Sequence, residues 1–359
     1  MKLPTLMVMI VVCLSGVGPA QGQTQPLQSP FDVNNLLRGA DESLASFTCK
    51  RPPSPVQDLT FDGFYKRGSG SSVVDKDAMR KYRAARKPID KFARTIIKMS
   101  DRYLAAAQPN SGIAQCVFSW LHHWAKGRAF LGEVSRQGSY VRKWALGTVS
   151  LAYLKIRKAR RFDSAKHNGI KKWIADWAEI VREGYSTNMH KSSRNNNHAY
   201  WASWSVGLAG VVVNNRSHFN WMVERQHAAM RQVEDDGTLP LEIKRGSKAL
   251  HYHVYSTHVL VMIASLAARN GINLYGIENG ALHGLVKRTV DGLSDPAYFV
   301  EKTGKNQSWV GKVSGGKLAW MEAYHARFPA SEIKRWIDQY RPMKNRRIGG
   351  NATLLYGAR

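Results

Sequence analysis

Two stretches of the sequence combine side chains that orient a ligand with side chains that move protons. The first covers 191–206 and has the sequence K-S-S-R-N-N-N-H-A-Y-W-A-S-W-S-V. Amides orient hydroxyls and carboxylates, an imidazole donates or accepts a proton, and indole faces pack on sugar rings. These residue types predict a site for a polar, ring-shaped ligand. The structural alternative is a helix start, because asparagine is a good N-cap and Trp201, Trp204 and Leu208 recur at helical spacing.

The second stretch covers 239–256 and has the sequence L-P-L-E-I-K-R-G-S-K-A-L-H-Y-H-V-Y-S. If this segment is one helix, Arg245 and Tyr252 lie seven residues apart and share a face, and Tyr255 follows three residues later. A guanidinium and a phenol on one face would provide a carboxylate clamp beside a proton-transfer group. The alternative is a tyrosine that packs its ring on a solvated helix.

Histidines are present, but their spacing does not favour a metal site. His251 and His253 are two residues apart, which on a helix directs their side chains about 200° from each other. His122 and His123 are adjacent and also diverge. No cysteines or carboxylates occur at the spacing of a zinc site. We therefore expect no metal ion.

A glycine- and serine-rich loop precedes the helical part of the chain. Residues 59–72 contain three aromatic residues, the last of them Tyr65, and then K-R-G-S-G-S-S at 66–72. Tyr65, Lys66 and Arg67 therefore place a phenol and two cations on a loop. One interpretation is a lid that closes over an anionic ligand near 61–72. The other is an ordinary solvated loop.

From Asp75 onward the apolar residues recur at helical spacing, and no long alternating β pattern appears. About ten helices with short connections imply antiparallel neighbours. This pattern predicts an all-α fold, and an incomplete α/α toroid of antiparallel helix pairs around a central cleft accommodates it. A plain helical bundle is the competing architecture, and no internal repeat supports a solenoid. Nothing between about Asp58 and Tyr340 resembles a linker, so we expect one domain over 56–359.

The chain is strongly basic, with 53 Lys and Arg against 26 Asp and Glu and a formal net charge of +27. Such an excess attracts polyanions. No zinc-finger spacing, RNA-recognition signature or basic zipper is present, so the sequence does not favour nucleic acid as the partner. Acidic polysaccharide and an anionic membrane surface satisfy the same electrostatics.

The N-terminal residues predict export. Lys2 is followed by an apolar run over 6–13 that is too short to span a bilayer, and small residues surround Ala20. We therefore expect a signal peptide over 1–22, no membrane anchor, and a periplasmic or secreted protein. An extended leader over 23–55 follows.

Cys49 and Cys116 remain after cleavage and predict one disulfide, with two buried free thiols as the alternative. Export makes an extracellular polyanion the expected partner.

Several motifs agree in order with one known family. They are N-N-H-A-Y-W at 196–201, R-K-W-A-L-G at 142–147, L-P-x-E-x-x-R at 239–245, A-L-H-Y-H-V-Y-S at 249–256, K-N-R-R-I-G-G at 344–350 and C-V-F-S-W-L at 116–121. The chain resembles the alginate lyase family, the periplasmic poly(β-D-mannuronate) lyases, whose fold is an α/α toroid. Ala199 replaces the serine of the family's N-N-H-S-Y-W motif. The resemblance covers about 49–351.

The resemblance implies a set of site residues. The catalytic residues would be Asn197, His198, Arg245 and Tyr252. Trp201 and Tyr255 match sugar-contacting positions, and Tyr65 matches the tyrosine of the family's lid. Relatives often carry lysine before that tyrosine, where this chain has Phe64, so Lys66 and Arg67 would supply the charge. The resemblance further implies a Cys49–Cys116 disulfide near the lid, and we expect a monomer.

Alginate is a 1,4-linked chain of uronic acids, and a lyase removes the C5 proton and expels the C4 oxygen. Arg245, Asn197 and His198 would stabilise the doubly negative enolate. In mannuronate the C5 hydrogen and O4 lie on one side, so Tyr252 could serve both, with Arg245 lowering the pKa of the phenol. In guluronate they lie on opposite faces, and His198 would be the base. The product carries a C4–C5 double bond, and no cofactor is required.

Two other functions are compatible with parts of the sequence. A non-catalytic protein that binds acidic polysaccharide would explain the charge and the aromatic residues, but it does not need an arginine, a tyrosine and a histidine together. A glycoside hydrolase needs two working carboxylates, and the candidate stretches contain only Glu242. The sequence therefore favours the lyase.

Overall fold

The computed structural model describes residues 25–37, 39–66, 73–159, 162–308 and 313–358. The predicted signal peptide, Arg67 and the rest of the predicted lid over 67–72 lie outside the described residues. The α-helices are α1 (Val33–Leu37), α2 (Lys76–Ala105), α3 (Ser111–Lys126), α4 (Arg136–Ile156), α5 (Ser164–Glu183), α6 (Asn197–Val213), α7 (Arg216–Met230), α8 (Pro240–Ile243), α9 (Ala249–Arg269), α10 (Ala281–Ser294), α11 (Ala297–Thr303), α12 (Gly315–Leu318), α13 (Trp320–His325), α14 (Ser331–Tyr340) and α15 (Ala352–Tyr356). The short strands β1 (Lys344–Asn345) and β2 (Gly350–Asn351) pair antiparallel.

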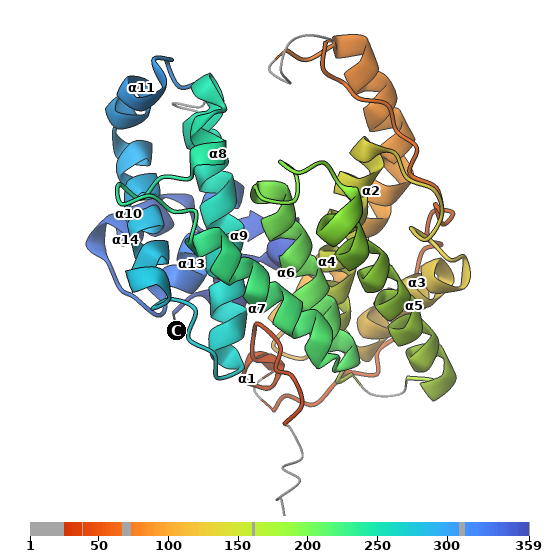
Figure 1. Ribbon diagram of the computed structural model, residues 1–359. Helices are drawn as coiled ribbons and strands as arrows, with labels where there is room; N and C mark the ends of the chain where they lie inside the picture. Colours follow the sequence, from red (N-terminus) through yellow and green to blue (C-terminus); the bar gives the residue numbers. More distant parts are fainter. Residues whose placement is uncertain (1–24, 38, 67–72, 160–161, 309–312, 359) are drawn as a thin grey trace, which may run out of the picture.

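The helices follow one another around an open arc, from α2 at one side through α4 and α6 to α9 and α10 at the other (Figure 1). Helices α4, α6 and α9 are buried on nearly all faces, whereas α3, α5, α7 and α10 bury one face and expose the other. Helix α6 packs against α4, α5, α7 and α9. An inner and an outer layer of paired helices form the incomplete α/α toroid that the sequence predicts.

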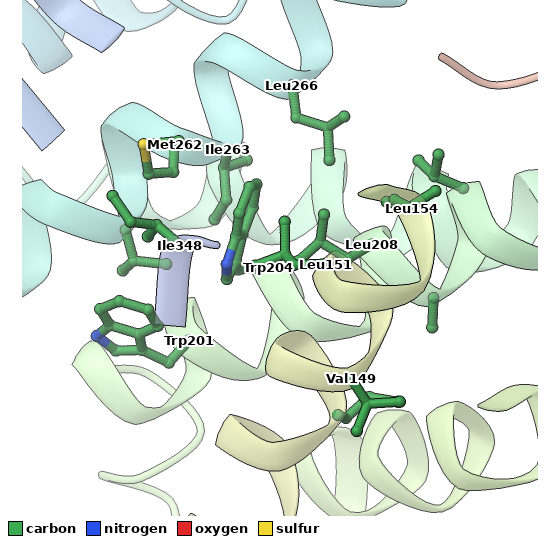
Figure 2. Close-up of a cluster of buried hydrophobic side chains, with 14 of the residues drawn as sticks. Val149, Leu151, Leu154, Trp201, Trp204, Leu208, Met262, Ile263, Leu266 and Ile348 are labelled. Atoms are coloured by element: carbon green, nitrogen blue, oxygen red, sulfur yellow. The ribbon is translucent and has the colours of Figure 1, made fainter. Parts of the chain in front are cut away.

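The inner helices meet in a continuous apolar core. Figure 2 shows Trp204 of α6 between Ile263 of α9 and Leu151 of α4, with Leu208 of α6 beside Leu151 and Ile348 from the C-terminal segment on the side of α9. All five side chains are buried. Packed rings and branched side chains hold the inner helices in one arrangement, which is the requirement for positioning polar groups at their ends.

The leader over 25–55 lies against the helical body with α1 as its only helix among the described residues. The predicted disulfide between Cys49 and Cys116 is confirmed, with a Cα–Cα distance of 5.4 Å. The leader is further held where the indole N–H groups of Trp120 and Trp124 donate to the carbonyl oxygens of Lys50 and Pro53, at 2.8 and 3.0 Å. Within the described residues, no helix is long and apolar enough to cross a membrane.

Candidate active site

A cavity of about 770 Å³ lies where α4, α6 and α9 begin. All four residues predicted to be catalytic line it, together with Tyr65 and Tyr255. The remaining lining residues are Phe61, Asp62, Gly63, Phe64, Ser135, Arg136, Gln137, Tyr140, Trp144, Ser192, Ser193, Asn196, His251, Val254, His258, Lys317, Asn345 and Arg347. The tertiary structure thus brings residues from six separate parts of the chain to one cavity.

The lining is cationic. The described lining residues include four cationic side chains, Arg136, Arg245, Lys317 and Arg347, and a single carboxylate, that of Asp62. Such a surface attracts an anionic ligand. The described residues contain no group of three or more His, Cys, Asp or Glu side chains that could hold a metal ion.

Helix α6 begins at the cavity wall and presents Asn197 and His198 there. Its N-cap is Asn196, whose side chain accepts a hydrogen bond from the His198 backbone N–H at 3.0 Å. The predicted helix start is therefore confirmed, and it is also the place where these polar side chains reach the cavity. The ligand site stays a prediction.

A buried glutamate holds Asn197 in place. One carboxylate oxygen of Glu242 accepts from the Asn197 backbone N–H at 3.0 Å and from its side-chain N–H at 2.9 Å. Burial raises the pKa of Glu242, and the two bonds from Asn197 oppose that effect. Glu242 therefore supports the site from behind and does not line the cavity. This placement removes the carboxylate that a glycoside hydrolase would have used.

Arg245 and Tyr252 are neighbours, but a continuous helix is not the reason. The guanidinium donates to the Tyr252 hydroxyl at 3.1 Å and lies 4.2 Å from the centre of its ring. Helix α8 ends at Ile243, a 3₁₀ turn covers Gly246–Lys248, and α9 begins at Ala249. Gly246 has φ +56°, a conformation that glycine adopts without steric cost. Arg245 and Tyr252 are therefore in contact, although the segment 239–256 does not form the single helix on which the argument from spacing depended, because the chain turns at Gly246.

The protonation of Tyr252 differs from the prediction. Burial raises the pKa of Tyr252, and the nearby Arg245 lowers it by less. The net shift is upward, so the phenol is neutral in the free protein at neutral pH. The spacing of Arg245 and Tyr252 in the sequence could not predict this upward shift of the pKa, because the desolvation comes from the packing around the cavity.

His198 is held between a ring and a cation. Its imidazole stacks on Tyr140 with centroids 3.8 Å apart, and its Nδ1 lies 2.9 Å from the Nζ of Lys143. Burial, followed by Lys143 and three arginines, lowers the pKa of His198 well below its usual range. The imidazole is therefore neutral and oriented.

Tyr255 and Trp201 occupy successive layers. The ring of Tyr255 stacks on Trp201 at 5.1 Å, and Arg347 donates to the Tyr255 hydroxyl. Trp201 is only 1% exposed and does not line the cavity, so its predicted contact with a sugar is not supported by its placement. It packs beneath Tyr255 because position 201 faces the core of the inner helices. Tyr255 itself does line the cavity.

The described part of the predicted lid reaches the cavity through its aromatic residues. Phe64 and Tyr65 line the cavity, and the ring of Tyr65 lies 5.4 Å from the Nζ of Lys248. Lys66 is exposed and outside the lining, while its backbone N–H donates to Val73 at 2.9 Å. Lid closure stays a prediction.

Sequence reasoning assigned no site role to several lining residues. On α4, Arg136, Gln137, Tyr140 and Trp144 form a polar and aromatic stripe at helical spacing, which is the signal that could have identified them. Arg347 comes from the R-R-I-G-G segment, and its guanidinium lies 3.8 Å from the ring centre of Trp144. An arginine pair before two glycines carries no such local signal.

The sequence profile of the family described as Alginate lyase matches residues 64–299. An alginate lyase of Pseudomonas syringae pv. tomato is 33% identical over 362 residues, covering 98% of this chain and 94% of the relative. The chain belongs to the alginate lyase family. An alginate lyase of Azotobacter vinelandii is 33% identical over 317 residues, covering 86% of this chain and 84% of the relative. The family predicted from the motifs is confirmed.

Solved structures of the alginate lyase family have the same fold. The crystal structure of alginate lyase A1-III from Sphingomonas species A1 superposes with a TM-score of 0.79 at 26% identity, covering 94% of this chain and 97% of that one. A variant of A1-III complexed with a tetrasaccharide gives a TM-score of 0.81 at 24% identity. The predicted α/α toroid is confirmed.

Proposed function

We propose that this member of the alginate lyase family depolymerises alginate by β-elimination at 1,4-linked mannuronate. The observation that carries the proposal is the meeting of Arg245, Tyr252, Asn197 and His198 in one cationic cavity. A uronate polymer supplies the negative charge that this lining attracts. The names of the relatives support alginate as the polymer.

The chemistry requires a developing charge to be stabilised. Loss of the C5 proton spreads a second negative charge onto the uronate carboxylate, which becomes an enolate. Arg245, the second side-chain N–H of Asn197 and an N–H of His198 are donors fixed beforehand around that position, which lowers the barrier without reorganisation. Glu242 keeps the Asn197 amide in that orientation.

Tyr252 is the group proposed to move the protons. Its phenolate oxygen takes the C5 proton, the C4–O4 bond breaks with its electron pair on O4, and the same tyrosine returns a proton to O4. A C4–C5 double bond remains in the product. One side chain can serve both ends only when the C5 hydrogen and O4 lie on one side, which favours mannuronate over guluronate.

The experiment is ultraviolet absorbance of the conjugated unsaturated uronate on mixing the purified protein with polymannuronate. We expect a steady rise for the wild type and a loss of at least about 100-fold for Tyr252→Phe, within the range for removing a general acid or base. Tyr340→Phe, on the outer helix α14, is the matched control and should leave the rate unchanged.

The outcomes separate the candidate functions. A rise that survives Tyr252→Phe retains the lyase and rejects Tyr252 as the proton-transfer group. No rise on polymannuronate or polyguluronate, with binding still measurable by calorimetry, favours the non-catalytic polysaccharide-binding protein. A product without the conjugated double bond but with new reducing ends indicates hydrolysis.

A further inference from the structure

Lys143 is a buried lysine directly behind the cavity. It lies on α4 and its side chain is 0% exposed. Its Nζ lies 2.7 Å from the hydroxyl of Tyr185 and 2.9 Å from Nδ1 of His198. The rings of Tyr140, Trp144 and Tyr185 surround the same nitrogen at 4.7, 5.1 and 4.8 Å from their centres. The lysine therefore occupies an aromatic cage that opens onto His198.

A second buried lysine on the same helix shows how unusual this arrangement is. Lys155 is also 0% exposed, but it pairs with the carboxylate of Asp101 and donates to the carbonyl oxygen of Gly349. Among the described residues, no carboxylate lies within ion-pair distance of Lys143. A buried, charged lysine without a carboxylate is costly, so its presence here points to a role performed through Tyr185 and His198.

The hydrogen-bond inventory limits what that task can be. If Lys143 is an ammonium, it has three donors and no acceptor, and its neighbour His198 then accepts at Nδ1. A neutral imidazole that accepts at Nδ1 carries its proton on Nε2. His198 lines the cavity while Nδ1 faces Lys143, which leaves Nε2 as the nitrogen for a ligand.

We propose that Lys143, kept as an ammonium by the three rings around it, is a positioning residue that holds His198 as a neutral imidazole with its proton on Nε2. Lys143 would thereby exclude His198 as the base for guluronate. The second part rests on the proposed function. With Nε2 protonated, the ring has no lone pair directed at the cavity. It can donate to the enolate that develops when Tyr252 removes the C5 proton. It cannot take a proton from the opposite face.

The electrostatics around the pair favour a neutral His198 and act in both directions on the charge of Lys143. The cations that face His198 are Lys143, Arg245, Arg136 and Arg347, and together with burial they lower its pKa, so a second proton is disfavoured. Burial, followed by Arg347, lowers the pKa of Lys143, and the three ring faces act in the opposite direction by stabilising a cation. The tyrosines that contact the pair are Tyr140 and Tyr185, and burial raises the pKa of Tyr185.

The first test is the tautomer of His198 in the wild-type protein, read from the ring ¹⁵N shifts of protein labelled with ¹⁵N-histidine. The His198→Ala variant assigns the signals by their loss. We expect a neutral ring with the proton on Nε2 across the neutral pH range. A ring protonated on Nδ1, or on both nitrogens, overturns the proposal. The result does not depend on any substrate, so it stays separate from the fate of the proposed function.

The second test removes the donor. Lys143→Met keeps the length of the side chain without an N–H, and Lys143→Gln introduces an amide oxygen that can accept from Nδ1. We expect the Nδ1-protonated form to appear in both variants and kcat/KM on polymannuronate to fall about 10- to 100-fold, as when other supporting partners of a histidine are lost. The ratio of rates on polyguluronate and polymannuronate should rise.

Tyr185→Phe is the matched control, because it removes the other partner of Lys143 and leaves the Lys143–His198 contact in place. We expect its tautomer and its substrate ratio to match the wild type. Equal losses on both polymers in Lys143→Met, with the His198 tautomer unchanged, would show that Lys143 serves stability alone. If neither Lys143 variant folds, the wild-type tautomer still decides the proposal.

Discussion

Tyr252 carries its proton in the free protein because burial outweighs the attraction of the adjacent Arg245. The proposed elimination needs the deprotonated oxygen, so only a small fraction of molecules is ready to react at neutral pH. The other titratable groups that affect Tyr252 are Tyr65, Glu242 and Tyr140. A substrate carboxylate bound at Arg245 would reduce the effect by which this cation lowers the pKa of Tyr252. The proton on one hydroxyl therefore sets the pH range of the whole reaction.

This protonation state predicts the pH dependence. Because the reactive form is the base and its pKa lies above the ordinary value of about 10, kcat/KM on polymannuronate should rise from about pH 7 to about pH 9. His198 is already neutral in this range and should add no inflection near its ordinary pKa of about 6.5. Initial rates of product absorbance at low substrate concentration measure the profile. Rates that fall above about pH 7, with the protein still folded, would contradict the assigned role of Tyr252.

At the scale of elements, the break between α8 and α9 decides where Arg245 points. Pro240 stands in the first turn of α8, and Gly246 turns the chain before α9 begins. A straight helix would have placed Arg245 two turns below Tyr252, whereas the turn folds its guanidinium over the phenol ring at 4.2 Å. The site thus depends on a single left-handed residue between two helices.

The prediction at this scale is that Gly246→Ala lowers both stability and activity. A side chain at φ +56° costs about 1–2 kcal/mol, and relief of that strain would move the neighbouring Arg245. Urea denaturation gives the stability and product absorbance the activity. Gly169→Ala is the matched control, because Gly169 lies within α5 with no atom within 4 Å of a built Cβ. The control should gain up to about 1 kcal/mol. Equal stability of the two variants would rule out strain at Gly246.

At the scale of the whole molecule, the leader joins the disulfide to the cavity. After Cys49 the chain follows α3 through the bonds from Trp120 and Trp124, and the Leu59 N–H then donates to Glu133 at 2.8 Å. Tyr65 lies six residues further on and lines the cavity. The disulfide therefore anchors the segment that leads to Tyr65. The formal net charge of +27 favours a polyanionic partner for the molecule as a whole.

Removal of the disulfide should destabilise the protein more than it impairs the site. The bond closes a loop of 67 residues, which in the chain-entropy account contributes at most about 4 kcal/mol. We expect the double variant Cys49→Ser, Cys116→Ser to lose most of this free energy of unfolding in urea. Its activity at low temperature should persist, because the hydrogen bonds from Trp120 and Trp124 still hold the leader. An unchanged unfolding midpoint in the double variant would show that the disulfide does not stabilise the folded protein.

Features that depend on local pattern were predictable from the sequence. The helical spacing of apolar residues from Asp75 onward predicted an all-α fold, and the family motifs implied the toroid. The asparagines before His198 predicted the start of α6, and two cysteines predicted one disulfide. The types of the four proposed catalytic residues, together with the motifs around them, also predicted the family. Each of these properties is encoded within a few turns of chain or in residue identity.

Only the tertiary structure decided the environment of each group. It placed Trp201 in the core and Arg347 in the cavity, it raised the pKa of Tyr252, and it caged Lys143 behind His198. These outcomes depend on which side chains arrive from other helices and on how much water they exclude. Burial and charge proximity are properties of neighbours distant in sequence, so the spacing of residues along one helix does not determine them.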